Sequence, residues 1–268
     1  MANLLRFTRL ISGRPVSKGN IKPSSPKGGG GGVPTRGGGG LQTVTPTLIG
    51  VNSATLDGQM STNLLSGGAA VGDYVVIMCA FQSASALTFS NVDDGGTGNV
   101  WSQLGTIGRA ATDTVSLLFV GCPVTVAWSP STLNMDINMS GSTTRFAVSV
   151  WKIAPSAGVS SVFSTGTPVV NNTITTSHAA TTVSVLNKQV IFGAAAIATD
   201  DVITGDSDTT NGNWSAVDTR LGDEGIEPST VSLSVQYKVV NADGNQSWTA
   251  TTGTGRRSVC NTVILQAA

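Results

Sequence analysis

Short apolar runs separated by turn residues fill the chain from about residue 41 onward. Runs rich in Val, Ile and Phe between Gly, Asn and Asp clusters are typical of β-strands. Long runs predict strands at Asp73–Phe81, Thr114–Val120, Arg145–Lys152, Gln189–Ala198, Val231–Val239 and Ser258–Leu265. Shorter runs predict further strands at Thr125–Trp128, Met135–Met139 and Ser247–Thr251. Because no segment sustains the helical period of about 3.6 residues, we expect an all-β fold.

The strand-like runs differ in how much of each is apolar. Val75–Phe81 and Val190–Ala196 are apolar at nearly every position. We expect these strands to be central, with one face in the core and the other covered by loops or a neighbour. In contrast, Val231–Tyr237 alternates between apolar and polar residues, so we expect it to have one face in water.

The body of the chain repeats itself. Each half starts with an apolar strand, passes through an acidic loop to a Trp-Ser pair, and ends in a strand after an arginine. Trp101 lies 44 positions before Arg145, and Trp214 lies 43 positions before Arg257. Each half alone would leave an apolar face exposed. We therefore expect two groups of about four strands to form one antiparallel, jelly-roll-like β-sandwich of about eight strands.

Residues 1–40 differ from this body in charge and composition. They hold seven basic residues and no acidic one, together with runs of glycine. The remaining residues hold eight basic and fifteen acidic side chains, a net charge of −7. Opposite signs allow the two parts to attract other copies. We predict a basic glycine/proline-rich anchoring arm at 1–40 and a β-sandwich domain at 41–268, with halves of about 41–155 and 156–268.

Two interpretations of the arm remain open. Gly- and Pro-rich chain cannot bury enough apolar surface to order itself, which is typical of a flexible linker. Alternatively, it becomes ordered along neighbouring subunits. Its first residues have near-helical apolar spacing but are too short for a stable isolated helix. The residues expected to act in assembly are Leu4, Leu5, Arg6, Phe7, Arg9, Leu10, Arg14, Lys18, Lys22, Lys27 and Arg36.

Composition and cysteine usage indicate the cellular compartment in which the protein assembles. Charged residues make up 11% of the chain, against roughly 25% in typical soluble domains. Cys79, Cys122 and Cys260 lie in or beside apolar runs without a CxxC spacing, so we expect free, buried thiols and assembly in a reducing host cytoplasm. We find neither a secretory h-region nor an apolar run long enough to span a membrane.

Signals for catalysis are weak. The single histidine, His178, lies in a polar stretch, and we predict that it is a surface residue. No GxSxG elbow is present to supply an activated serine. A glycosidase needs two facing carboxylates, and the only glutamates, Glu224 and Glu227, share one loop. We therefore expect no enzyme, with a cell-wall hydrolase using these glutamates as the least favoured hypothesis.

The sequence also has few residue patterns that would bind a metal, a cofactor or nucleic acid. Zinc would need clustered Cys and His. Calcium remains a hypothesis for Asp206–Gly212, Asp93-Asp94 and Asp200-Asp201, with ordinary solvated turns as the alternative. Gly28–Gly32 lacks the pattern of a phosphate-binding loop, and the arm has few aromatic residues for stacking on bases. We expect no cofactor, no metal and no nucleic-acid partner.

The tryptophans bear on a binding role. Trp151 lies within an apolar strand, which predicts core packing. Trp101 and Trp214 follow loops at matching positions of the two halves. They are the residues we expect to face a glycan, if the protein binds one.

Several of these features together resemble a family. The residues are Asp73–Ile77 after a glycine, Trp101 after an Asp-Gly loop, Arg145–Ile153, Gln236–Val239 and Trp248-Thr249. From about residue 45 to 268 the chain resembles β-sandwiches of tailed-bacteriophage virion proteins and related bacterial surface proteins. The resemblance implies a jelly-roll-like sandwich in a tail, fibre, neck or capsid-decoration protein. It supplies no catalytic residues to transfer, and it does not extend to the arm.

The leading hypothesis is a non-enzymatic phage virion structural protein, assembled in the host cytoplasm. Its arm would anchor it to other virion proteins, namely portal, neck, tail or capsid subunits, and we expect a homo-oligomer. The alternative is a carbohydrate-binding or receptor-binding β-sandwich module that recognises a host-surface glycan. The position in the particle and the oligomeric state stay open at the level of sequence.

Overall fold

The computed structural model describes residues 45–54, 59–111, 114–154, 161–199, 201–222 and 230–267. These residues form strands and loops, and every strand pair is antiparallel. The first half contains β1 (Thr47–Ala54), β2 (Met60–Ser61), β3 (Tyr74–Gln82), β4 (Phe89–Asp93), β5 (Ser102–Gln103), β6 (Gly108–Ala110), β7 (Val115–Pro123), β8 (Asp136–Met139) and β9 (Arg145–Ile153). The second half contains β10 (Ser161–Thr165), β11 (Val169–Ala179), β12 (Val183–Val185), β13 (Val190–Ile197), β14 (Ile203–Thr204), β15 (Asp218–Leu221), β16 (Ser232–Val239), β17 (Gly244–Gln246) and β18 (Thr249–Ala267). The predicted all-β class is confirmed.

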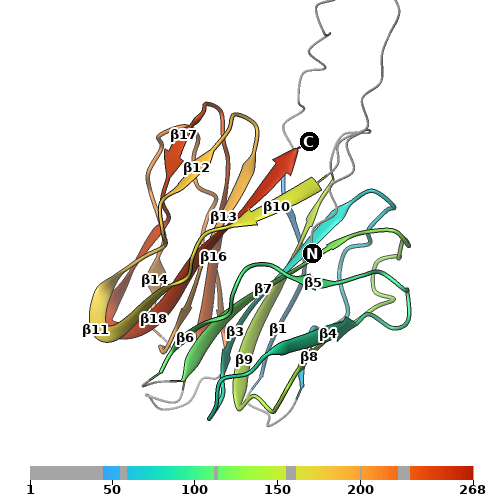
Figure 1. Ribbon diagram of the computed structural model, residues 1–268, viewed down its shortest axis with the longest axis horizontal. Helices are drawn as coiled ribbons and strands as arrows, with labels where there is room; N and C mark the ends of the chain where they lie inside the picture. The colour runs from blue at the N-terminus through green and yellow to red at the C-terminus, as the bar shows by residue number, and fades with distance from the viewer. Residues whose placement is uncertain are drawn as a thin grey trace, which may run out of the picture. The chain divides into compact units, whose positions relative to one another are not determined.

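Each half of the sequence builds a main sheet of its own. The first has the order β1-β9-β3-β7-β5, and the second has the order β10-β18-β13-β16-β15. Figure 1 shows this division in its colours, with the blue-to-green strands in one sheet and the yellow-to-red strands in the other. The two orders match strand for strand, so the halves, hereafter the first and second repeat, share one topology.

The strand register supports the same equivalence. Val75 of β3 and Ile191 of β13 both face the outer side of their sheet. Their partners on the neighbouring strand are Cys122 of β7 and Lys238 of β16. In the contacts between sheets, β9 packs on β16, β7 on β18, and β3 on β13. Since β9 corresponds to β18 and β7 to β16, exchanging the repeats preserves these contacts. The repeats therefore pack like the two halves of an isologous dimer.

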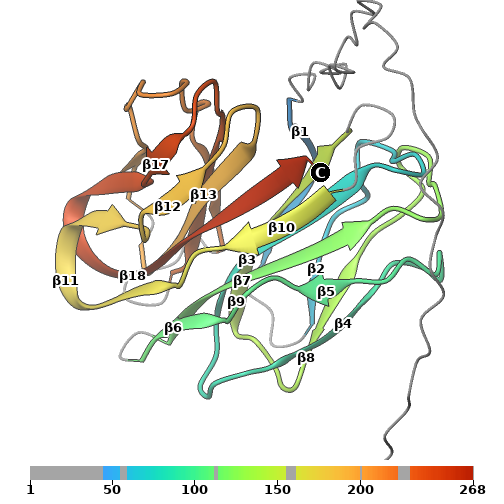
Figure 2. The same cartoon turned by 45° about the horizontal axis from the view of Figure 1, so that its top comes forward.

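Both faces of both main sheets are buried. Alternate residues of the central strands form a core shared by the two sheets, which includes Val76, Phe119 and Phe192. The opposite face of the first sheet is covered by β2, β8, β4 and loops. The opposite face of the second is covered by loops and the β12-β17 pair. Figures 1 and 2 show these small sheets on the outer sides of the main ones. The prediction that continuous apolar runs are covered on both faces is confirmed.

The expectation of a wet face on Val231–Tyr237 was wrong. Its polar residues Ser232, Ser234 and Gln236 are at most 3% exposed. They belong to the outward face of the second main sheet. There the loop of residues 205–215 and Trp248 bond to Gln236, while Ser234 bonds to Thr219 and Ser232 to the Ile197 carbonyl. An alternating pattern distinguishes two faces of a strand, but a polar face is buried when other segments supply its hydrogen bonds.

Other expectations needed smaller corrections. The described residues contain 18 strands rather than about eight, because short strands of two to five residues extend the main sheets or form two small sheets of their own. Thr125–Trp128 is not a strand. There the side chain of Asn99 accepts hydrogen bonds from the backbone N–H groups of Thr125 and Val126, which closes a turn. Only Trp128 makes an isolated bridge, to Ala69.

The chain divides into two units, residues 1–39 and 40–268, and all described residues belong to the second. The assembly residues of the arm therefore lie outside the described part of the structure. Within the described ranges, no helix has the length and apolar character needed to cross a membrane.

Gly193 provides a test of the packing against the second main sheet. A Cβ on Gly193 would overlap the ring of Trp248, which is fully buried and has no room to withdraw. We predict that Gly193→Ala lowers the free energy of unfolding by about 1–3 kcal/mol because the crowded layer must shift. Denaturant titration measures this loss. Gly253→Ala is the control, since a Cβ at Gly253 would have no neighbour within 4 Å; equal losses in the two variants would contradict the packing.

Candidate functional site

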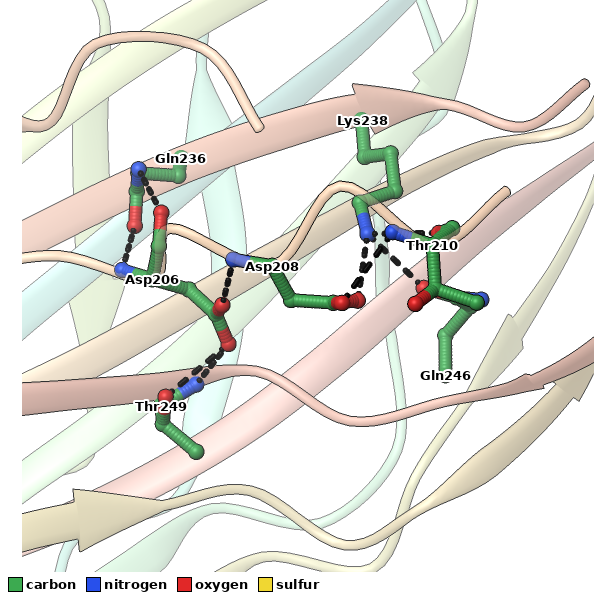
Figure 3. A network of polar contacts seen from close by, with 7 residues as sticks. All are labelled: Asp206, Asp208, Thr210, Gln236, Lys238, Gln246 and Thr249. Carbon is green, nitrogen blue, oxygen red and sulfur yellow. Dashed lines mark hydrogen bonds and ion pairs between the residues drawn. The ribbon is translucent and has the colours of Figure 1, made fainter. Parts of the chain in front are cut away.

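A buried lysine lies at the centre of a polar network in the second repeat. Lys238 of β16 is 0% exposed. Its Nζ donates to Asp208 Oδ2 at 3.1 Å, to the Thr210 carbonyl at 3.0 Å and to Gln246 Oε1 at 2.9 Å. Figure 3 shows these acceptors arranged around the ammonium group. Three N–H donors thus have three acceptors, which offsets the cost of removing the charge from water.

An aromatic ring completes the surroundings of this ammonium group. The Trp214 ring lies on it, with Nζ 4.9 Å from the ring centroid. Attraction between a cation and the face of an indole ring is strongest where water is excluded. Trp214 and Lys238 also form an isolated backbone bridge, so the two residues are fixed opposite each other.

The loop above Lys238 is held by its own aspartates. Asp206 Oδ1 accepts from the backbone N–H of Asp208 at 2.7 Å, and Asp208 Oδ1 accepts from that of Thr210 at 3.0 Å. Asp206 Oδ2 accepts both the backbone N–H and the hydroxyl of Thr249, at 2.8 and 2.9 Å (Figure 3). Aspartates that accept from the backbone two residues ahead are typical of tight turns. The acidic loop is thereby tied to β16 and to the start of β18.

Gln236 joins this loop to the sheet. Its Oε1 accepts from Asp206 N at 2.6 Å and from Trp248 Nε1 at 2.9 Å. Its Nε2 donates to the carbonyls of Asp206 and Ser215, at 3.2 and 2.7 Å. The amide is therefore fully used in positioning the loop and the indole ring.

These bonds bear on the calcium hypothesis for Asp206–Gly212. Hydrogen bonds from Thr210, followed by the neighbouring Lys238, hold the pKa of Asp208 below its usual range. The position that a cation would take beside this carboxylate is filled by the protein's own ammonium group. Across the described ranges, no group of three or more His, Cys, Asp or Glu side chains is arranged to hold a metal ion.

The other acidic turns are also bonded internally. Asp93 Oδ1 accepts from Gly95 N at 3.0 Å, and Asp94 Oδ2 accepts from Trp101 Nε1 at 3.1 Å. Asp201 forms an ion pair with Arg256 at 3.5 Å. Its predicted neighbour Asp200 lies outside the described residues, as do Glu224 and Glu227.

The two tryptophans predicted to face a glycan are largely buried. Trp101 and Trp214 are each 9% exposed. Trp101 belongs to the covered core of the first repeat, and Trp214 lies against Lys238. Sugar stacking requires an open ring face, and neither ring presents one in this structure. The matching positions of the two tryptophans reflect equivalent packing roles in the two repeats.

The first repeat has a different group at the position of Lys238. From the register described above, Cys122 is its counterpart. Burial, followed by the Asp94 carboxylate, raises the pKa of the Cys122 thiol to about 12. One repeat thus places a neutral thiol where the other places a buried, hydrogen-bonded ammonium group.

Sequence reasoning missed Lys238 because its partners lie at least eight residues away along the chain.

The thiols behave as predicted. Cys79, Cys122 and Cys260 are free and buried. Burial raises the pKa of Cys79 above its ordinary range and that of Cys260 to about 12. Thiols of this kind stay protonated at neutral pH and are poor nucleophiles.

The prediction that His178 is a surface residue was wrong, since it is 0% exposed. Asn171 Nδ2 donates to Ser258 Oγ at 2.9 Å, which leaves the Ser258 hydroxyl to donate to His178 Nδ1 at 2.8 Å. Thr252 Oγ1 donates to the Thr254 carbonyl and so accepts from His178 Nε2, at 3.0 Å. This network assigns a neutral imidazole with its proton on Nε2. Burial lowers the pKa of His178 to about 4.

Comparisons with known proteins give no relative for this arrangement. No family model matches the chain, no curated protein is detectably similar in sequence, and no solved structure matches its fold.

The Lys238 centre generates a stability prediction. Lys238→Met removes the one donor among the described residues to Oε1 of the buried Gln246, and leaves Asp208 without its cation. We expect a loss of about 2–3 kcal/mol in the free energy of unfolding. Denaturant titration measures it, with Lys188→Met as the control because Lys188 is half-buried and outside the centre. A Lys238→Met variant as stable as the control would show that the contacts of the Lys238 ammonium group contribute nothing to the free energy of unfolding.

His178 generates a prediction of pH dependence. In the unfolded chain its pKa is 6.5, whereas in the folded chain it is about 4. As the pH falls below 6.5 the unfolded state gains a proton that the folded state does not, so stability declines until about pH 4. This contribution amounts to about 3 kcal/mol.

Thermal or denaturant unfolding from pH 7.5 to 4 measures the effect. His178→Gln removes the imidazole, so its stability curve should be lower at neutral pH and should converge with the wild-type curve towards pH 4. Other groups titrate equally in both proteins. Parallel curves would rule out His178 as the source.

Proposed function

We propose that the protein is a non-enzymatic structural subunit of a particle, of the tailed-phage virion type. We further propose that its basic arm, residues 1–40 and hereafter the leader, anchors it to neighbouring subunits. The observation that carries this proposal is the separation of charge. Residues 1–40 contain seven basic residues and no acidic one, whereas the rest of the chain has a net charge of −7. Such a division favours attraction between the leader of one copy and the body of another.

The chemistry of the body supports the same role. Thiols, the imidazole and the caged ammonium are the groups that most often act as nucleophiles or bases in enzymes. Here Cys79, Cys122, Cys260, His178 and Lys238 are buried and contribute to packing or internal hydrogen bonds. Using these groups for stability suits a subunit whose task is mechanical.

We also propose a specific fold class and a location in the particle. The jelly-roll-like class, and a place in the tail, fibre, neck or capsid decoration, derive from the sequence resemblance described above. Ordering about 40 leader residues would cost on the order of 1–2 kcal/mol each for the backbone. Anchoring therefore requires extensive burial of the leader between subunits, as well as charge attraction. The glycan-binding alternative has less support because the rings of Trp101 and Trp214 are covered.

The leader's charge can be tested in the full chain. We predict that changing all seven leader cations to Gln leaves the unfolding midpoint unchanged but lowers incorporation into purified particles at least about tenfold. The substitutions are Arg6→Gln, Arg9→Gln, Arg14→Gln, Lys18→Gln, Lys22→Gln, Lys27→Gln and Arg36→Gln. Quantitative immunoblotting of particles measures incorporation.

Lys188→Gln in the body is the matched control and should incorporate normally. Wild-type-like incorporation of the leader variant would contradict the anchor. Absence of the wild-type protein from purified particles would overturn the proposed function itself.

A further inference from the structure

Exposed apolar side chains gather at one end of the first repeat. Val71, Val100 and Val126 are 67%, 72% and 45% exposed. They lie in three loops at the end of the sheet where β3 begins and β7 ends. Single exposed hydrophobic residues are ordinary, but a group of them in adjoining loops is typical of a binding surface. We call these three residues the valine tip.

The loops that carry the valine tip are joined by hydrogen bonds. Gly72 N donates to the Val124 carbonyl, and Val124 N donates to the Asp73 carbonyl, both at 2.9 Å. Asn99 Oδ1 accepts from Thr125 N at 2.8 Å and from Val126 N at 2.9 Å. The valines are therefore held in fixed positions, and a partner binding there does not have to order the loops.

The surroundings of the valine tip indicate an apolar partner. Residues 66–72, 97–102 and 121–129 contain no charged side chain. The nearest carboxylate along the chain, that of Asp73, already accepts from Ala70 N at 2.8 Å. A purely basic peptide would gain little at this surface, whereas Leu, Ile or Phe side chains would lose contact with water.

The leader contains such side chains, and β1, the first strand of the body, begins at the same end of the sheet. Thr47 of β1 pairs with Lys152, Lys152 pairs with Val75, and Val75 pairs with Cys122, so these residues form one row across the sheet. Three strand spacings separate the ends of this row, about 14 Å. The apolar residues of the leader are Leu4, Leu5, Phe7, Leu10 and Ile11.

The stretch between Ile11 and Thr47 is long enough for the apolar start of the leader to reach another copy. About 35 residues separate Ile11 from Thr47, and they are rich in Gly and Pro. A flexible chain of that length has a root-mean-square span of roughly 30–35 Å and a fully extended length above roughly 100 Å. The apolar segment of one copy can thus contact the valine tip of a neighbour.

We propose that the valine tip of one copy binds the apolar leader segment, residues 4–11, of a second copy. This inference rests on the proposed function, in which the leader acts between subunits. The apolar residues would supply the contact at the valine tip, while Arg6 and Arg9 would remain available to acidic side chains elsewhere on the body. The leader would then be anchored by burial as well as by charge.

Site-directed cross-linking of the full chain tests the contact. The three native cysteines are buried, so a cysteine added on the surface is the reactive one. One copy carries Thr8→Cys, which keeps every apolar leader residue, and a differently tagged copy carries Ala127→Cys, which is exposed beside the valine tip. A short bismaleimide should yield at least about tenfold more mixed dimer from this pair than from Thr8→Cys with Thr176→Cys, an exposed control on β11.

A second variant separates specific binding from chance proximity. Val100→Asp with Val126→Asp in the Ala127→Cys copy should reduce the mixed dimer to the control level, while Val202→Asp, at an 85% exposed position of the second repeat, should not. Circular dichroism checks that each variant is folded.

Equal yields for the tip and control positions would overturn the inference. A chain carrying both Thr8→Cys and Ala127→Cys that cross-links only within itself would overturn its intermolecular form. Loss of particle incorporation in the leader variant together with no cross-link at the tip would leave the proposed function standing and remove this inference alone.

Discussion

Five central strands, β3, β7, β9, β13 and β18, have apolar residues on both faces, and covering these faces determines the arrangement of the rest of the body. Neither main sheet can leave a face in water, so each needs two covers. The shared core between the repeats supplies one cover for each sheet. The other covers are made from loops and very short strands, which explains why so much of the chain outside the central strands is buried. Burial of apolar surface on this scale is the main favourable term in folding.

The two repeats cover the outward faces of their main sheets with different kinds of residues. The first uses apolar residues of β2, β4 and β8, and it places the neutral Cys122 beneath them. The second covers a polar row with an acidic loop, and the charge of Lys238 is tolerated there because each N–H donor has an acceptor. The ion pair with the partly exposed Asp208 joins a fully buried ammonium group to the loop, and removing a partner of a buried charge is costly. It favours one position of the loop over others.

Much of the architecture was predictable from local patterns. Long apolar runs identified β3, β7, β9, β13 and β16 to within a few residues, and the matching spacing from Trp101 and Trp214 identified the repeats. In contrast, β11 is rich in Thr and Asn and shows no apolar alternation, so it was missed. It is a strand because β18 supplies its hydrogen bonds. The burial of His178 and Lys238 was missed for a related reason. Their partners come from distant segments, and polar residues in a local pattern indicate exposure unless those partners are known.

The shared core should make both repeats one cooperative unit. Native-state hydrogen exchange of the full chain tests this by comparing backbone amides of β3 and β13, which face each other across that core. We predict that the slowest amides of both strands exchange with the same free energy, equal to that of global unfolding. If the amides of one strand exchanged through an opening that leaves those of the other protected, each repeat would be stable without its partner, and the account would be contradicted.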